Sequence, residues 1–452
     1  MGMMEWKKLL SPHRVGSSHP GVISQDRSPF QRDFDRIVFS SAFRRLQDKT
    51  QVFPLAKTDY VRTRLTHSLE TSSIGRSLGT MTGVFLAREF DTGGAQPSDV
   101  GAAVAAAALA HDIGNPPLGH AGEEAIRHWF THSPVAADLR SGMTVCEAAD
   151  IERYEGNAQG FRVLTALEMP DQYGGMQLTC ATLGAFAKYP SASKVPVKPF
   201  GVAGKKFNFF RLEEKLFSEV AEHTGLIEAG PAAWQRHPLA YLVEAADDIA
   251  YRIVDFEDGQ RLGLIDYAEL ERLFLEIIDS ERTAEHVATI RSASRRAEFL
   301  RAQAIGKLVR EVAQVFMDKH GELLEGRLEK PLIEYVDCQE PLNRIQSRST
   351  RDIYNHRQVA EIVGAGFELV SGMLDIFVPC VNEMAREAAG GVPASFRSRR
   401  LFELLPGHGE LLQEPRYQES GYYRVMLVLD YVSGMSDSYA VSLYQKLKGI
   451  SL

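Results

Sequence analysis

The sequence has few cysteines, and their spacing argues against two kinds of small stabilised fold. Four cysteines are scattered among 452 residues without a Cys-x-x-Cys pair. This arrangement favours reduced, packed thiols over a zinc knuckle or a disulfide framework. The four are Cys146, Cys180, Cys338 and Cys380.

Long hydrophobic runs are also missing. The longest, Ala102 to Ala110, is too short and too alanine-rich to span a bilayer. Near the start of the sequence, Lys7 and Lys8 are followed by only two apolar residues before Ser11, too few for a signal peptide. We therefore expect a cytoplasmic protein that does not interact with a membrane.

The sequence lacks the glycine-rich fingerprints of the common nucleotide-binding folds. The stretch from Gly201 to Lys206 has neither the spacing nor the Ser/Thr of a Walker loop. A net charge of −8 argues against a chain built mainly to coat nucleic acid, although it leaves room for a local basic patch.

No strand-rich stretch or internal repeat is visible, and 44% of the residues are hydrophobic, enough for a substantial core. We therefore predict an all-α protein. The length permits about three domains, although a large helical enzyme can form one continuous body.

An alanine-rich helix delivers two metal-ligand side chains to its end. The run from Ala102 to Ala110 has high helix propensity, and Gly114 and Pro116 end the helix just after His111 and Asp112. Neutral imidazole and carboxylate both coordinate divalent first-row metals. This stretch is therefore half of a candidate metal site, and its partners must come from elsewhere.

Two further predicted helices carry suitable partners. His67 lies in one that can continue to about Phe90, and the other begins after Pro238 and ends at Gly259. Polar residues of the second follow one another at steps of three or four, on one face: Glu244, Asp247, Tyr251, Asp255 and Asp258. Any one of these acids is most simply a solvated surface group, but burying the row would require a cation or a polar ligand.

The order His, His-Asp, Asp on separate helices resembles that of the HD-domain metal-dependent phosphohydrolases. This resemblance implies four metal ligands: His67, His111, Asp112 and Asp247. Two imidazoles and two carboxylates leave open positions on an ion with octahedral preference, which favours Mn²⁺, Mg²⁺ or Fe²⁺ and keeps Zn²⁺ as an alternative.

Six sequence blocks look like those of the bacterial dGTP triphosphohydrolases and occur in that family's order between about residues 25 and 447. They are Arg44–Val52, Arg62–His67, His111–Glu123, Tyr154–Gly160, Glu244–Tyr251 and Asp430–Asp437. Ser436, where we expect Thr, is a small departure. The resemblance implies an HD-domain catalytic core at residues 31–260, after an irregular arm at 1–30. Residues 261–452 would form a helical C-terminal region that completes the pocket and makes the contacts of a homo-oligomer, often a hexamer.

His120 and Glu123 lie three residues apart, close in sequence to the metal pair, so both can point into one cavity. The alternative is a helix N-terminus with an acid in its first turn. The resemblance implies that they are the catalytic pair, one a proton-transfer group and the other its orienting partner. His128 and His132 are more simply read as an outer helix face.

The resemblance also assigns substrate-binding residues. Gln51 and Asp255 would hold the sugar 3′-hydroxyl, Arg64 would meet the triphosphate, and Tyr251 would stack on the sugar. Arg351 is either a phosphate ligand or an exposed arginine at a helix start.

The stretch from Lys188 to Lys206 is rich in lysine, proline and glycine. It is most simply a surface loop, although a basic loop beside a metal site would suit a polyphosphate.

The implied reaction is hydrolysis of dGTP, or another dNTP, to a deoxynucleoside and tripolyphosphate. A second interpretation is another HD hydrolase, acting on a nucleoside monophosphate, a cyclic nucleotide or an alarmone. A third is a regulatory protein that responds to a dNTP or single-stranded DNA effector and whose metal site only binds. The basic cluster from Arg397 to Arg400 keeps the last interpretation open.

Overall fold

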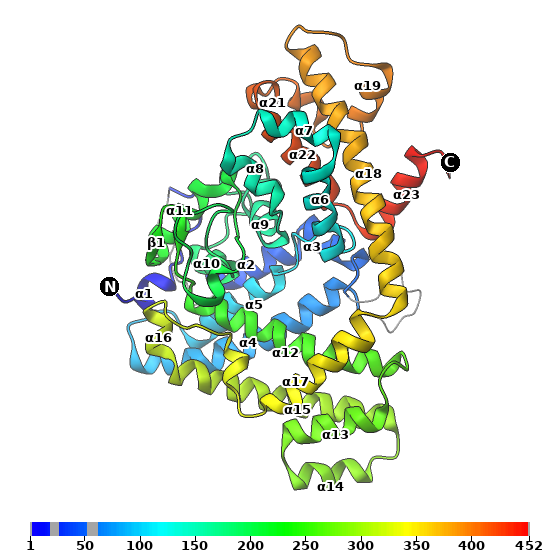
Figure 1. The fold of residues 1–452 in the computed structure, drawn as a ribbon. Coiled ribbons are helices and arrows are strands. Elements are labelled where there is room, and N and C mark those ends of the chain that lie inside the picture. The colour runs from blue at the N-terminus through cyan, green and yellow to red at the C-terminus, as the bar shows by residue number, and fades with distance from the viewer. Residues whose placement is uncertain (1, 19–26, 52–61, 451–452) are drawn as a thin grey trace.

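The computed structural model describes residues 2–18, 27–51 and 62–450. The described chain contains α-helices α1 to α23, several short 3₁₀ or π segments and a single two-stranded hairpin, β1 (Glu228–Gly230) with β2 (Ala233–Trp234). The all-α prediction is therefore confirmed. Figure 1 shows an elongated molecule with α14 at one end and α19 near the other.

Two hydrophobic cores organise these helices. The first is built mainly by α1 (Trp6–Leu9), α2 (Pro29–Val38), α3 (Ser41–Arg45), α4 (Arg64–Glu89), α5 (Pro97–Ala110), α10 (Cys180–Phe186), α11 (Glu214–Thr224), α12 (Pro238–Arg261), α13 (Tyr267–Ile278), α14 (Glu281–Thr289), α15 (Ala293–Asp318), α16 (His320–Leu324) and α17 (Gln339–Arg348). The second is built mainly by α6 (His120–His132), α7 (Pro134–Ser141), α8 (Val145–Glu152), α18 (Arg357–Ala388), α19 (Phe396–Phe402), α20 (His408–Leu411), α21 (Pro415–Glu419), α22 (Gly421–Ser433) and α23 (Asp437–Leu447).

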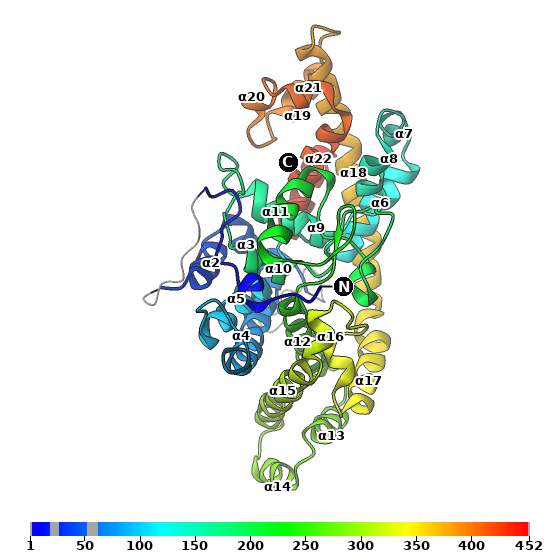
Figure 2. The ribbon, with the colours of Figure 1, turned by 90° about the vertical axis from the view of Figure 1, so that its left-hand side faces the viewer.

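Helix α9 (Gly156–Arg162) joins the two cores, because Ala158 packs in the second and Phe161 in the first. Each core draws on helices from both sides of residue 260, so the packing units are not contiguous in the sequence. Figure 2 shows the first core's α13 to α15 and the second core's α19 to α21 extending in opposite directions from the middle of the molecule.

Helices α4 and α5 lie in unusually close contact. A Cβ atom added at Gly79 would lie 2.9 Å from the Cα of Gly101, and one added at Gly83 would lie 2.8 Å from the Cα of Pro97. Only glycine permits backbones to approach so closely, and substitution would push the helices apart. This contact fixes the relative positions of His67 on α4 and of the residues that follow α5.

Helix α12 runs through Gly259 to Arg261 rather than ending at that glycine. A Cβ at Gly259 would lie 2.4 Å from a methyl carbon of Ile353. Glycine here provides room for a neighbouring segment instead of a helix stop, which corrects our interpretation of the sequence.

The N-terminal segment packs against the first core, and residues 6–9 of the expected irregular arm form a short helix; residues 1 and 19–26 of that arm lie outside the described residues. Met4 donates its backbone N–H to the carbonyl of Leu324 at 2.9 Å, and Trp6 donates its indole N–H to His320 at 2.7 Å. Trp6 and Leu9, on the short helix α1, are buried.

Among the described helices, α18 alone is long and apolar enough to cross a membrane, a test that buried core helices also pass. It packs against α6, α19 and α22 within the second core.

Candidate active site

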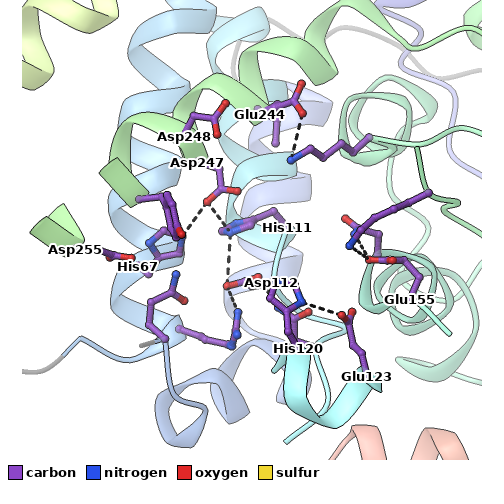
Figure 3. A pocket seen from close by; sticks show the side chains of 18 of the residues that line it. His67, His111, Asp112, His120, Glu123, Glu155, Glu244, Asp247, Asp248 and Asp255 are labelled. Atoms are coloured by element: carbon purple, nitrogen blue, oxygen red, sulfur yellow. Dashed lines mark hydrogen bonds and ion pairs between the residues drawn. The ribbon is translucent and has the colours of Figure 1, made fainter. Parts of the chain in front are cut away.

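A cavity of about 690 Å³ opens where the two cores meet (Figure 3). Ten of the eleven site residues expected from the sequence line it: Gln51, Arg64, His67, His111, Asp112, His120, Glu123, Asp247, Tyr251 and Asp255. Arg351 does not, because its side chain is 65% exposed and pairs with Asp352.

His67, His111 and Asp247 bring three ligand atoms to within 4.8 Å of one another. Oδ1 of Asp247 lies 3.1 Å from Nε2 of His67 and 3.5 Å from Nε2 of His111. Asp112 adjoins the group, with Oδ2 3.6 Å from Nε2 of His111. Two imidazoles and two carboxylates fit a divalent ion.

The tautomer of His111 suits this role. Its Nδ1 lies 2.7 Å from the carbonyl oxygen of Ala108, which can only accept, so Nδ1 carries the proton. The lone pair of Nε2 is therefore free to face Asp247 and a bound ion.

The electrostatic environment keeps both carboxylates ionised. Burial alone would raise the pKa of Asp112, but Arg64 and His111 outweigh it and lower the pKa to about 2. Burial likewise opposes ionisation of Asp247, whose pKa is nevertheless held well below its usual range by His111 and by the hydrogen bond with His67. Negatively charged ligands are therefore present at neutral pH.

His120 and Glu123 form a second pair at the cavity wall. Nδ1 of His120 lies 2.8 Å from Oε2 of Glu123, and the histidine side chain is 83% exposed whereas the glutamate is 2% exposed. Glu123 also accepts the backbone N–H of Gly156 at 2.6 Å. Burial would raise the pKa of Glu123, but the interactions with His120 lower it. A buried carboxylate thus orients a ring whose Nε2 is accessible.

The loop before His120 is held by a residue near the end of the described chain. Leu118 and Gly119 both have positive φ, 61° and 58°, a conformation that is unusual for leucine. Asp437 is buried and accepts the backbone N–H of Leu118 at 2.9 Å. Its other oxygen accepts the N–H and the hydroxyl of Thr50, next to Gln51, at 2.9 and 2.7 Å.

Lys49 also connects the loop before His120 with distant parts of the chain. Its buried ammonium donates to the carbonyl of Ser433 at 2.7 Å and to that of Asn115. Burial lowers the pKa of Lys49 to about 7, against the opposing charge of Asp437. The segment before α4, the loop before α6 and the end of α22 therefore meet at one lysine.

At the other end of the cavity, two buried oxygen atoms lack a hydrogen-bond donor within the described chain. Among the described residues, buried Oε1 of Gln51 and buried Oδ1 of Asp255 have no hydrogen-bond partner. Burial raises the pKa of Asp255 to about 7. Unpartnered buried acceptors cost free energy, so such a pair indicates a binding site for a donor.

Tyr354 contributes to this end of the cavity, and sequence reasoning missed it. Its hydroxyl donates to Oδ2 of Asp255 at 3.0 Å, and its ring stacks on Tyr251 with 5.1 Å between centroids. Tyr354 ends a π-helical segment, Ser349–Tyr354, and no spacing in the sequence predicts that geometry.

Two lysines also line the cavity. Nζ of Lys188 lies 3.3 Å from Oε1 of Glu244, and Nζ of Lys206 lies 2.8 Å from Oε1 of Glu155. They are the first and last residues of the lysine-rich stretch, so part of that stretch does lie beside the candidate metal group. The abundance of lysine in the stretch from Lys188 to Lys206 is the sequence feature that indicated this position.

The comparisons with known proteins agree with this geometry. The HD domain family model matches residues 64–174, which include three of the four candidate metal ligands. The class defined by fold and site is thus that of HD-domain proteins.

Full-length relatives narrow the class. A deoxyguanosinetriphosphate triphosphohydrolase-like protein of Synechocystis sp. is 43% identical, covering 99% of this chain and all of the relative. One of Pseudomonas aeruginosa is 39% identical over 99% of both chains. The deoxyguanosinetriphosphate triphosphohydrolase of Yersinia pseudotuberculosis is 31% identical over 92% of this chain and 93% of its own. The chain belongs to the family of deoxyguanosinetriphosphate triphosphohydrolases and their like-named relatives, as the sequence blocks predicted.

Proposed function

We propose that the chain is a divalent-metal-dependent triphosphohydrolase that acts on dGTP, within the wider class of deoxynucleoside triphosphates. The observation that carries the proposal is the meeting of three sets of groups in one cavity: a His/Asp metal-ligand group, the His120–Glu123 pair and two unpartnered acceptors. Each set serves a different part of a deoxynucleoside triphosphate.

In this proposal His67, His111, Asp112 and Asp247 hold one ion, with Mn²⁺ or Mg²⁺ preferred and Fe²⁺ or Zn²⁺ as alternatives. Such an ion supplies Lewis-acid stabilisation of negative charge at the reacting phosphate. Arg64, Lys188 and Lys206 line the cavity and are the proposed contacts for the rest of the triphosphate. Each pairs with a carboxylate in the structure, respectively Asp112, Glu244 and Glu155, and would exchange that partner for a phosphate.

His120 is the proposed proton-transfer group. With Nδ1 directed at Glu123, the ring can take a proton from attacking water or give one to the leaving oxygen through Nε2. Water adds to the α-phosphorus, the bond from phosphorus to the 5′-oxygen breaks, and that oxygen leaves with a proton. The products are deoxyguanosine and tripolyphosphate.

Gln51 and Asp255 are proposed to receive the sugar 3′-hydroxyl, since their free oxygens lie in the same cavity. Tyr251, one turn after Asp247 on α12, would pack against the sugar. Arg351, which pairs with Asp352 outside the cavity, would need a different side-chain conformation to meet a phosphate.

Product analysis tests the proposal directly. The full chain is incubated with dGTP and Mn²⁺ in ¹⁸O-labelled water, and the products are separated by ion-pair chromatography. We expect deoxyguanosine and tripolyphosphate, with the label in tripolyphosphate. Release of dGMP and pyrophosphate, or label in deoxyguanosine, would refute the proposed reaction. Nucleoside monophosphates, cyclic nucleotides and alarmones, tested in parallel, address the other HD-type activities.

The regulatory alternative receives less support. Arg399 pairs with Glu387 and Arg400 with Glu403, so much of the positive charge of that cluster is neutralised locally. The family resemblance also implies a homo-oligomer, often a hexamer, and this is part of the proposal. Analytical ultracentrifugation of the full chain tests it. Stimulation or inhibition by single-stranded DNA or a second dNTP would be detected in the same activity assay.

A further inference from the structure

A second group of metal-ligand side chains lies outside the cavity. It combines His13, from the N-terminal segment, with Glu219 and His223 of α11. The two α11 residues are four apart and therefore share one helix face. One ligand atom from each of the three residues falls within 4.8 Å of the others, and none of the three lines the cavity.

Contacts on both sides hold this group together. Nε2 of His13 lies 3.5 Å from Oε1 of Glu219, and the same oxygen accepts the backbone N–H of Gly16 at 2.9 Å. The carbonyl of His13 accepts the N–H of Cys180, the first residue of α10, at 2.7 Å. Hydrogen bonds thus tie the segment that carries His13 to α10 and to the Glu219 side chain of α11.

The imidazoles of His13 and His223 stack face to face, with 3.7 Å between centroids and 14° between planes. In the described chain, no lysine or arginine lies within ion-pair distance of Glu219, so its carboxylate has no competing cation.

We propose that His13, Glu219 and His223 bind one divalent metal ion, with Zn²⁺ preferred. Two imidazoles and one carboxylate are a common three-residue zinc set, and a water completes the tetrahedron. Because parallel rings direct their lone pairs in parallel, one ring must turn for both to meet the ion. His223 is exposed on α11 and has the space to do so.

The bound ion would cross-link the N-terminal segment to α11. This site is independent of the proposed catalytic function, because its ligands are outside the catalytic cavity.

The test measures zinc bound per full-length chain after chelator treatment and equilibrium dialysis. Four variants are compared with the parent: Asp247→Ala, Glu219→Gln, a His13→Ala/His223→Ala double substitution, and a matched control, His128→Ala/His132→Ala. His128 and His132 are also a stacked histidine pair, 4.2 Å apart, and they lie on the surface of α6. Glu219→Gln keeps an acceptor for Gly16 while it removes the ligand charge.

We expect the His13/His223 variant and Glu219→Gln to lose one zinc relative to the parent, or to bind it at least about tenfold more weakly. The His128/His132 control should lose none. The loss should be additional to that caused by Asp247→Ala, which keeps the two sites distinguishable. In hydrogen exchange, zinc should slow the Gly16 amide of the parent and leave that of the double variant unchanged. Equal zinc content in parent and His13/His223 variant, or equal loss in the control, would overturn the proposal.

Discussion

Asp437 accepts the backbone N–H of Leu118 at 2.9 Å, although 319 residues separate them. Its second carboxylate oxygen binds Thr50, so one side chain connects the loop before His120 with the segment that carries Gln51. The proposed proton-transfer group and a proposed sugar ligand are thus positioned by the same acid.

We expect Asp437→Asn to slow turnover about 10- to 100-fold, because an amide offers one acceptor where both carboxylate oxygens are used and small displacements of catalytic groups are costly. Metal content should be unchanged, since none of the proposed ligands contacts Asp437. Steady-state kinetics and elemental analysis measure the two quantities. Ser438→Ala is the control, because that exposed hydroxyl donates to Asp48 and contacts neither Leu118 nor Thr50. Parent-like turnover of Asp437→Asn would contradict the positioning role.

His120→Ala and Asp247→Ala should separate two kinds of loss. Removing His120 should lower kcat by about 10² to 10⁴, the usual contribution of an acid–base group, with metal retained. Removing Asp247 should abolish metal occupancy, because the remaining ligands compete poorly with water. Elemental analysis of both variants decides, and loss of metal from His120→Ala would place that residue among the ligands instead.

A substrate without the 3′-hydroxyl should be hydrolysed poorly. A hydroxyl has one proton to donate, so without it one of the two free oxygens, of Gln51 or Asp255, would stay unpaired at a cost of about 1 to 3 kcal/mol, which corresponds to about a 5- to 150-fold lower kcat/KM. Comparing dGTP with 2′,3′-dideoxyGTP measures the difference. In Gln51→Ala this difference should shrink, and an undiminished ratio would remove Gln51 from the sugar site.

The end of the cavity that is proposed to bind the sugar should also discriminate against substrates with a 2′-hydroxyl. The Tyr251 ring is braced by Tyr354, so it cannot easily yield to a larger sugar. We predict a strong preference for dGTP over GTP, narrowed in Tyr251→Ala. Tyr354→Phe keeps the ring stack while it loses the hydrogen bond to Asp255, so it should preserve the preference. Equal kcat/KM values for dGTP and GTP in the parent protein would refute this assignment.

The buried carboxyl of Asp150 should make stability depend on pH. It accepts the Arg211 N–H and the Tyr422 hydroxyl, but burial outweighs both and raises its pKa from 3.8 to about 6. A raised carboxyl pKa stabilises the folded state below the unfolded pKa, and this contribution is lost as pH rises through 6. Relative to the parent, Asp150→Asn should therefore gain about 2 kcal/mol of unfolding free energy between about pH 4.5 and 7.5.

Urea unfolding at the two pH values measures that gain. Exposed Asp138→Asn controls for the loss of one negative charge. A pH-independent difference between Asp150→Asn and the parent would show that the buried carboxyl does not titrate in this range.

Local sequence rules predicted the ends of helices well where residues of the same helix determine them. The helix that contains His67 was expected to reach about Phe90 and ends at Glu89, and the alanine-rich helix delivers His111 as expected. Capping residues, proline and alanine propensity act within a few residues, so they can be recognised without the fold.

Other features depended on contacts that sequence spacing does not encode. Gly259 was interpreted as a helix end, but its role is to admit Ile353 from a distant segment. Tyr354 donates to Asp255 from the end of a π-helical segment, a backbone geometry that sequence spacing does not predict. Within the acidic row of α12, Glu244, Asp247 and Asp255 line the cavity, whereas Asp258 pairs with Arg62 and does not line it. The helical spacing of these acids alone could not predict which of them line the cavity.

The division of the cavity between two hydrophobic cores has a consequence for partly unfolded chains. His67, His111 and Asp247 are carried by or directly follow helices of the first core, whereas His120 begins α6 of the second. Heat that loosens only the second core would displace His120 and leave the proposed metal ligands assembled. If the proposed site holds an ion, loss of activity on warming should therefore precede its release.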